Sequence, residues 1–328
     1  MREPVAIIVG STEILWSSII IVIAVMAGFF MMHSLYIANG GKRLRLLFFY
    51  PLSVCFSYIF GKGIFYYCHL EQYSSFKSAL SFSENGYNMA GIIPGICLAA
   101  FLVCITDLKK VFLAILDGCA PMVSVVVSLL YLVHLYDDGC RGNAILSEER
   151  YHTLPFASPV LNTNGEVQYR LAVFFMAFIL FMIVGFMMKF FYLKFVEIKG
   201  RTFALFLLIF SSLEYILDST RYDSDFFPFN GFVSVIQIFA GVIILVLSVV
   251  LAVKSVKTTG LKWYHIILIL LILISMGAAG YLEYLVQRHG DMWQTYYLMM
   301  SLACIGMICF PYLLGSVNCK SKCNPFDY

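Results

Sequence analysis

Long apolar stretches separated by short polar connections dominate the chain. Nine of these stretches are about 20 residues long, which is the length of an α-helix that crosses the hydrocarbon core of a bilayer. The pattern therefore predicts an all-α integral membrane protein, a polytopic bundle of about nine transmembrane helices. The predicted spans lie near residues 14–37, 46–68, 88–106, 111–136, 170–193, 202–217, 231–253, 263–284 and 293–316.

Composition supports a membrane protein. Hydrophobic residues make up 61% of the 328 positions and charged residues only 12%, so a water-soluble fold could not cover the apolar surface. The first stretch resembles a signal peptide in position only. Its apolar run is long and no clear small-residue cleavage site follows, so we interpret it as a span.

The distribution of Lys and Arg predicts an orientation. With nine spans, 14 of the 22 basic residues fall in one set of loops and 7 in the opposite set, while Lys62 lies within a span. Cytoplasmic loops are enriched in Lys and Arg, so the N-terminus is predicted outside and the C-terminus inside. The net charge of +3 then reflects topology, and no nucleic-acid partner is expected.

The ten cysteines do not predict a metal site or a disulfide framework. Seven lie in or beside spans, where Cys usually acts as a small apolar residue. Cys140 lies in an outer loop, and Cys319 and Cys323 have no neighbouring His or second Cys pair. Motifs for phosphate loops, zinc proteases and hydrolase nucleophiles are also absent, so no metal and no cofactor are expected.

Ionisable residues at membrane depth mark the candidate site. Glu214, Asp218 and Arg221 are spaced to share one face at the end of the sixth span, and Lys62 and Asp117 lie inside other spans. Burial of charge in lipid is costly, so such side chains point into polar cavities or pair with one another. The alternative for the sixth span is a helix end frayed into water, with Asp218 and Arg221 forming a surface ion pair.

Five short motifs resemble, in their order and spacing, those of the prolipoprotein diacylglyceryl transferase family. They are a glycine-rich segment, the start of the fourth span, the end of a signature loop, an acid-x-x-Arg sequence, and a Gln-containing start of the seventh span. The motifs lie at residues 86–95, 116–121, 138–142, 217–221 and 235–241. The resemblance covers residues 14–253, approximately.

The resemblance implies a seven-helix core at residues 1–253, followed at 254–328 by two more helices and a short cytoplasmic tail. It also implies a location in the bacterial cytoplasmic membrane. Members of the family transfer diacylglycerol from phosphatidylglycerol to the lipobox cysteine of a preprolipoprotein. The expected partners are therefore this anionic phospholipid and a lipobox-containing peptide.

The same resemblance, combined with side-chain chemistry, suggests roles for ten residues. Cationic groups would hold the lipid phosphate, and a base would accept the proton of the substrate thiol. The residues expected to be catalytic are Arg221, Asp218 and His134. Those expected to bind substrate are Arg141, Lys62, Tyr87, Gly91, Gly95, Glu214 and Gln237.

Four key family positions differ in this chain. The family's motif histidine falls on Ala90, its signature arginine and asparagine fall near Tyr131 and His134, and an essential arginine falls on Glu214. Two hypotheses follow: a transferase with a substitute set of residues, or a non-catalytic relative that binds lipid or peptide. A transporter is a weaker third hypothesis, because no repeat of interrupted helices is visible.

Overall fold

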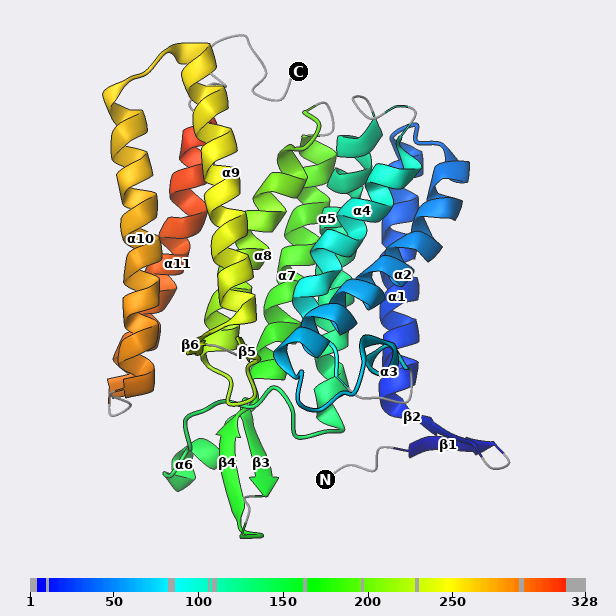
Figure 1. The fold of residues 1–328 in the computed structure, drawn as a ribbon, viewed down its shortest axis with the longest axis vertical. Coiled ribbons are helices and arrows are strands. Elements are labelled where there is room, and N and C mark those ends of the chain that lie inside the picture. The colour runs from blue at the N-terminus through cyan, green and yellow to red at the C-terminus, as the bar shows by residue number, and fades with distance from the viewer. Residues whose placement is uncertain are drawn as a thin grey trace.

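The computed structural model describes residues 5–9, 12–81, 86–105, 107, 111–161, 164–195, 198–227, 230–288 and 292–316. Long helices lie side by side along the long axis of the molecule (Figure 1). Three two-stranded antiparallel hairpins lie outside the long helices. The helices are α1 (Trp16–Ala38), α2 (Arg43–Cys68), α3 (Phe76–Ala79), α4 (Ile92–Val103), α5 (Leu113–Tyr131), α6 (Glu149–His152), α7 (Val173–Lys194), α8 (Arg201–Ser219), α9 (Val235–Thr259), α10 (Trp263–Arg288) and α11 (Trp293–Ser316). The strands are β1 (Val5–Val9), β2 (Thr12–Leu15), β3 (Ala157–Leu161), β4 (Val167–Leu171), β5 (Phe226–Phe227) and β6 (Asn230–Ser234).

The prediction of an all-α polytopic membrane bundle is confirmed. Within the described residues, 8 helices are long and apolar enough to cross a membrane, and large hydrophobic side chains such as Phe30 (78% exposed) and Trp263 (81% exposed) cover the outside. The segment predicted as a full span near 88–106 is shorter. It is an apolar helix over Met89–Val103, because the backbone before it is extended at Asn88, whose side chain caps the first turn.

The loops separate to the two ends of the bundle (Figure 1). The α1–α2, α7–α8 and α9–α10 connections lie at the upper end, while α3, α6 and the three hairpins lie at the lower end. This alternation matches the predicted order of the two sets of loops. The assignment of the lower end to the outside stays a prediction, as does the division of the chain at residues 253 and 254.

Two helices occupy the centre of the bundle. In the α5 and α8 spans, about 72% of the residues in the 18-residue apolar stretch are buried inside the bundle, a far larger share than in the surrounding helices. Asp117 of α5 joins them, because its carboxylate accepts hydrogen bonds from the backbone N–H groups of Gly200 (2.5 Å) and Phe203 (2.8 Å) at the start of α8. This intramembrane acid therefore caps a helix N-terminus, where negative charge is stabilised.

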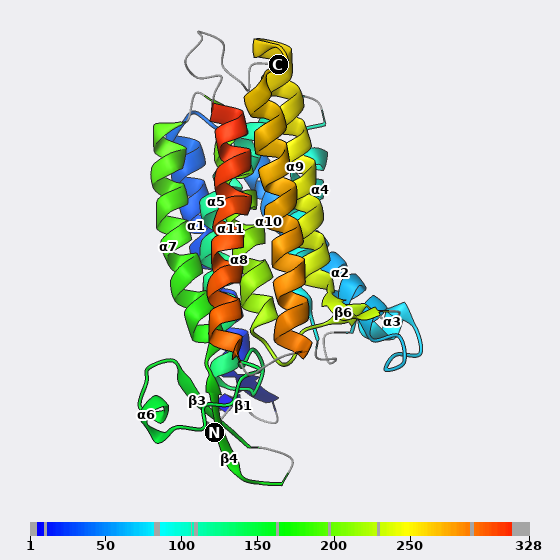
Figure 2. The ribbon, with the colours of Figure 1, turned by 90° about the vertical axis from the view of Figure 1, so that its left-hand side faces the viewer.

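The last two helices pack against the end of α8. Helices α10 and α11 stand beside α8 and α9 (Figure 2). Tyr297 of α11 donates a hydrogen bond to the carbonyl oxygen of Ser219 (3.1 Å), and the Ser219 hydroxyl donates to Glu283 of α10. Helices α10 and α11 are thus attached to the rest of the bundle at its lower end, where the charged residues of α8 lie.

Two glycines allow the backbone of the α4 segment to contact the backbone of α2. A Cβ atom on Gly91 would lie 2.1 Å from the backbone nitrogen of Gly61, and one on Gly95 would lie 2.4 Å from that of Ser57. Small residues at such crossings allow the close packing that holds membrane helices together. The glycine-rich motif therefore has a structural role at this contact.

We expect Gly91→Ala to lower the apparent melting temperature of the detergent-solubilised protein, because α2 must shift to admit the methyl group at a cost of roughly 1–3 kcal/mol. Gly277→Ala is the matched control, since a Cβ there meets nothing within 4 Å. Thermal unfolding of both variants checks the expectation. Equal melting temperatures for the two would mean that the α2–α4 contact is not tight.

Candidate functional site

The loop after α5 and the segment after α8 form one backbone structure at the lower end of the bundle. Residues 141–143 run beside residues 220–222, with Gly142 and Arg221 paired in a β-bridge. Two backbone hydrogen bonds join the segments, from Asn143 N–H to the Thr220 carbonyl (2.7 Å) and from Tyr222 N–H to the Arg141 carbonyl (3.1 Å). The signature-loop and acid-x-x-Arg motifs, about 80 residues apart in sequence, therefore lie side by side.

Asp223 reinforces this junction from its side chain. Its carboxylate accepts hydrogen bonds from the backbone N–H of Cys140 (2.8 Å) and from Nε of Arg221 (3.0 Å). Burial alone would raise the pKa of Asp223, but the Arg221 charge and these hydrogen bonds hold that pKa below its usual value. The carboxylate is consequently ionised at neutral pH.

Cys140 is a structural residue of the same junction. It is fully buried and has a positive φ of 53°, a conformation that a non-glycine residue rarely adopts. Burial raises the pKa of its thiol to about 12. The thiol stays protonated at neutral pH and is therefore unsuited to act as a nucleophile.

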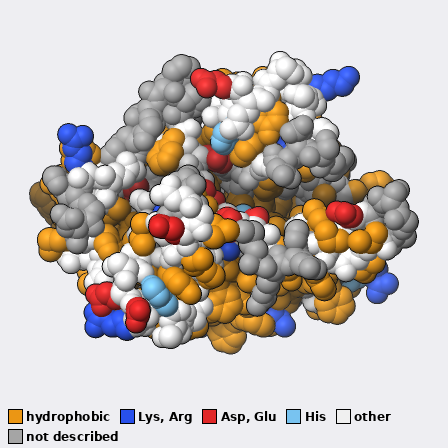
Figure 3. All heavy atoms as spheres, turned by 90° about the horizontal axis from the view of Figure 1, so that it is seen from below, with side chains coloured by type: hydrophobic (Ala, Val, Ile, Leu, Met, Phe, Trp, Pro, Cys, Tyr) orange, Lys and Arg blue, Asp and Glu red, His pale blue; other side chains and the backbone are white. Residues whose placement is uncertain are grey.

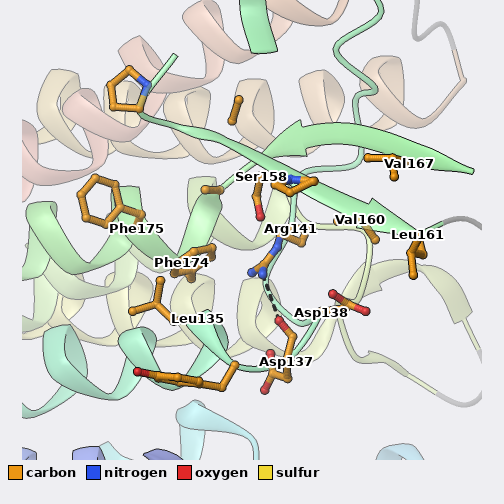
Figure 4. A pocket seen from close by; sticks show the side chains of 15 residues that line it. Leu135, Asp137, Asp138, Arg141, Ser158, Val160, Leu161, Val167, Phe174 and Phe175 are labelled. Carbon is orange, nitrogen blue, oxygen red and sulfur yellow. Dashed lines mark hydrogen bonds between the residues drawn. The ribbon is translucent and has the colours of Figure 1, made fainter. Parts of the chain in front are cut away.

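Arg141 organises its own loop. Its guanidinium donates hydrogen bonds to the carbonyl oxygens of His134 (2.9 Å), Asp137 (2.9 Å) and Gly139 (2.8 Å) and lies 4.4 Å from the centre of the Phe174 ring. Arg141 also borders a pocket of about 590 Å³ between this loop and β3. Figure 4 shows this pocket, with Leu135, Phe174 and Phe175 on one side and Asp137 and Asp138 on the other, near Val160 and Leu161.

His134 pairs with Asp137 inside this loop. The Nδ1 atom of His134 lies 2.9 Å from Oδ1 of Asp137, and the same oxygen accepts the backbone N–H of Gly139 (2.8 Å). Although burial opposes it, the hydrogen bond from His134 lowers the pKa of Asp137. The structure thus shows what orients the imidazole; a role for His134 as proton acceptor stays a prediction.

Arg221 borders a separate cavity of about 160 Å³. Its side chain is 14% exposed, and among the described residues its terminal nitrogens make no hydrogen bond, since Nε alone contacts Asp223. Most of the residues that line the cavity are polar. Its lining residues are Asn143, Asp218, Ser219, Arg221, Tyr222, Ser224, Phe226, Ser234, Gln237, Glu283 and Gln287.

Asp218 is the unusual member of this cavity. It is only 2% exposed, and neither carboxylate oxygen accepts a hydrogen bond of good geometry from a described residue, although the side chains of Ser224 and Ser234 lie close by. Arg221 is close enough to interact with it electrostatically. A buried carboxylate without hydrogen-bond donors is costly, so this group is available to a ligand that brings a donor.

Gln237 and Glu283 complete the cavity from α9 and α10. Gln237 forms a capping box with Ser234, in which Gln237 N–H donates to the Ser234 hydroxyl (3.1 Å) and the Gln237 side chain accepts from Ser234 N–H (3.2 Å). Glu283 is 3% exposed and was not identified from sequence. It lies within the predicted eighth span, so the rule that intramembrane acids mark functional sites would have found it.

Three of the four positions that depart from the family pattern, Ala90, Tyr131 and Glu214, lie near one another inside the bundle. The hydroxyl of Tyr131 in α5 donates to both carboxylate oxygens of Glu214 in α8 (2.8 and 3.0 Å). Glu214 and Ala90 border the same small cavity of about 10 Å³. The resemblance places family arginines at or near two of these positions and a histidine at the third, so the replacements form one cluster.

The remaining predicted site residues lie at the α2–α4 contact. The Tyr87 ring covers Gly61, and its hydroxyl donates to the Ser57 carbonyl (3.2 Å). Lys62 is buried, with its Nζ atom 5.8 Å from the centre of the Tyr58 ring, and borders neither the Arg141 pocket nor the Arg221 cavity. Packing accounts for Tyr87, Gly91 and Gly95 here; direct contact of these residues with a substrate stays a prediction.

The predicted cations therefore do not converge. Arg141 and Arg221 are neighbours in the backbone junction but border different cavities, and Lys62 borders neither. Asp218, Arg221 and Gln237 do share one cavity. Viewed from below, this end of the molecule carries carboxylates across its face, while most of the visible Lys and Arg side chains lie at the margin (Figure 3).

Asp225 links the segment after α8 to Asn88, just before α4. It was also not identified from the sequence as a candidate site residue. Its Oδ2 atom accepts a hydrogen bond from Asn88 (2.7 Å), and its Oδ1 atom lies 3.7 Å from Nε2 of His69. Burial raises the pKa of Asp225, while Asn88 and His69 oppose the rise. The acid lies in a loop with several other charges, and nothing in its local sequence distinguishes it from a solvated residue.

No family model matches the chain. A comparison with curated proteins finds similarity to phosphatidylglycerol–prolipoprotein diacylglyceryl transferase 1 of Clostridium perfringens, with 25% identity over 261 residues. The alignment covers 78% of this chain and 96% of the clostridial protein. This similarity supports the relationship indicated by the sequence motifs. Together with the apolar helices it supports a multi-pass membrane protein related to that transferase.

We expect Arg141→Lys to loosen the loop at residues 134–142, because a single ammonium group cannot replace a guanidinium bonded to three carbonyls. Loss of two such bonds, each worth about 1 kcal/mol, should speed amide hydrogen exchange in this loop by roughly tenfold or more. Arg150→Lys is the control, since that side chain is 69% exposed and pairs only at the surface. Unchanged exchange in Arg141→Lys would contradict the organising role.

Proposed function

We propose that this chain is a phospholipid-binding protein of the bacterial cytoplasmic membrane, built on the diacylglyceryl transferase fold, and that Arg221 holds the headgroup phosphate. In this proposal the protein does not transfer diacylglycerol from phosphatidylglycerol. The single observation that carries the proposal is the cavity of about 160 Å³ bordered by Arg221 and Asp218 at the end of α8.

The geometry of Arg221 suits a phosphate. Asp223 accepts a hydrogen bond from Nε, the terminal nitrogens of the guanidinium make none with a described residue, and the Arg221 side chain borders the cavity. Terminal guanidinium nitrogens form strong, charge-assisted hydrogen bonds to phosphate oxygens. The site lies where the apolar part of α8 ends and polar loops begin, the depth at which a lipid headgroup would meet the protein.

The residues around Glu214 are the reason for proposing that this chain has lost the transfer reaction. Transfer requires stabilisation of a departing phosphoglycerol anion and a thiolate on the substrate peptide. The Tyr131–Glu214 pair puts an acid where the family pattern has an arginine, and Ala90 replaces a histidine beside it. A negative or neutral group at that point cannot stabilise a developing anion as a guanidinium does.

The proposal predicts that anionic and zwitterionic phospholipids copurify with the wild-type protein and are lost from Arg221→Gln. Loss of a charge-assisted hydrogen bond should reduce bound phospholipid by about tenfold or more, measured by mass spectrometry of lipid extracts. Arg150→Gln is the matched control. It also removes a guanidinium, but from a side chain that is 69% exposed and borders neither cavity, so it should retain lipid. Equal lipid content in the wild type and Arg221→Gln would refute the site.

A second candidate function is diacylglyceryl transfer itself. It is favoured by the extent of the similarity, which spans 96% of the clostridial transferase, and by the pocket of about 590 Å³ beside β3, where a peptide substrate could lie. In this case Arg221 and His134 would replace the missing family residues. The lipobox peptide would supply the attacking cysteine.

An assay of transfer to a lipobox peptide in membranes separates the two candidates. We expect no product above background from this protein, under conditions in which an authentic diacylglyceryl transferase gives full conversion. Cells depleted of their own transferase should likewise not be rescued by expression of this chain. Product that disappears in Arg221→Gln would establish the second candidate instead.

A further inference from the structure

We infer that the Arg221 cavity recognises a phosphodiester joined to a primary ammonium group, the headgroup chemistry of phosphatidylethanolamine, and that α10 provides part of this selectivity through Glu283. This inference rests on the proposed lipid-binding function. It adds the headgroup class and assigns a role to the helices beyond the region of family resemblance.

The cavity has one cationic and two anionic side chains. Arg221 provides the guanidinium, and Asp218 and Glu283 provide carboxylates from α8 and α10. With the acids ionised, the lining carries a formal charge of −1. A headgroup with a net charge of −1, such as phosphoglycerol, would meet like charge there, whereas a zwitterion can place each of its charges against an opposite one.

The hydrogen-bonding state of the two acids indicates a donor-rich ligand. Glu283 already accepts from Ser219 and from the Gln287 side chain (2.9 Å), which fixes its orientation in the cavity. Asp218 is buried and neither of its oxygens accepts a hydrogen bond of good geometry from a described residue, although the side chains of Ser224 and Ser234 lie close by. An ammonium group offers three donors and a positive charge, so it would satisfy Asp218 and still reach Glu283.

The space is adequate for such a group. The cavity of about 160 Å³ is far larger than the 10–15 Å³ or so that admits one water molecule. Asn143, Ser224 and Gln237 add neutral polar groups to its wall. These side chains can solvate the linker and the phosphate oxygens that Arg221 does not reach.

The test uses full-length protein reconstituted in vesicles of equimolar phosphatidylethanolamine, phosphatidylcholine and phosphatidylglycerol, followed by extraction in mild detergent and quantification of the retained lipids. We expect phosphatidylethanolamine to exceed phosphatidylglycerol by about tenfold among retained lipids, the factor given by one charge-assisted interaction. Phosphatidylcholine should be retained less than phosphatidylethanolamine, because its quaternary ammonium has no N–H donor.

Two variants test the acids separately. Glu283→Gln and Asp218→Asn should each lower the ratio of phosphatidylethanolamine to phosphatidylglycerol by roughly tenfold while Arg221 still retains lipid. Glu149→Gln, an exposed acid on α6, is the matched control and should leave the ratio unchanged. Size-exclusion profiles and melting temperatures identify a variant that has not folded, and the other variant then decides.

Each outcome has a defined meaning. Three results would overturn the inference but leave lipid binding intact. The first is a retained lipid mixture equal to the input, and the second is a preference for phosphatidylglycerol. The third is a ratio of phosphatidylethanolamine to phosphatidylglycerol that does not change in the correctly folded acid variants. Retention of no lipid of any class overturns the proposed function itself. Displacement of lipid by soluble glycerophosphoethanolamine but not by glycerophosphoglycerol supports headgroup recognition, and equal displacement by both contradicts it. Tight binding of glycerophosphoethanolamine to lipid-free protein would identify a soluble phosphodiester as the ligand.

Discussion

The carboxylate of Asp223 is the interaction on which the lower end of the protein depends. By accepting hydrogen bonds from Cys140 N–H and from Arg221 Nε, it joins the loop after α5 to the segment after α8. These are the two central helices of the bundle, so the junction connects their ends directly. Arg141 donates hydrogen bonds within its own loop and Arg221 borders the cavity, so two cations that are neighbours in the backbone structure serve different places.

Burial in an apolar bundle explains why three of the four replaced positions, Ala90, Tyr131 and Glu214, occur as a group. An arginine deep among helices requires acceptors, and once one such residue is lost its neighbours must change or remain unsatisfied. The Tyr131 hydroxyl and the Glu214 carboxylate satisfy each other, and Ala90 leaves only a small apolar space beside them. The cluster is therefore internally consistent, whereas a single Glu in place of an arginine would have left a buried charge without a donor.

The acids found within apolar segments differ in the hydrogen-bond donors that the tertiary structure places around them. Asp117 meets the free N–H groups at the start of α8 and becomes a helix cap. Asp218 accepts no hydrogen bond of good geometry from a described residue and borders the cavity. Both acids lie within apolar segments, and the intramembrane rule treats them alike. The difference arises because one faces a helix terminus and the other faces the space between α8, α9 and α10.

Hydrophobic periodicity alone determined that this chain is a polytopic helix bundle, because only helices with satisfied backbones are stable in lipid and their length is set by the bilayer. Motif order also named Asp218, Arg221 and Gln237 as candidate site residues, and their function stays a prediction. Only the tertiary structure decided that these three border one cavity together with Glu283, and that Arg141 and Lys62 do not border it. The reason is geometric: cavities form where helices far apart in sequence meet, and linear spacing carries no information about which faces will meet.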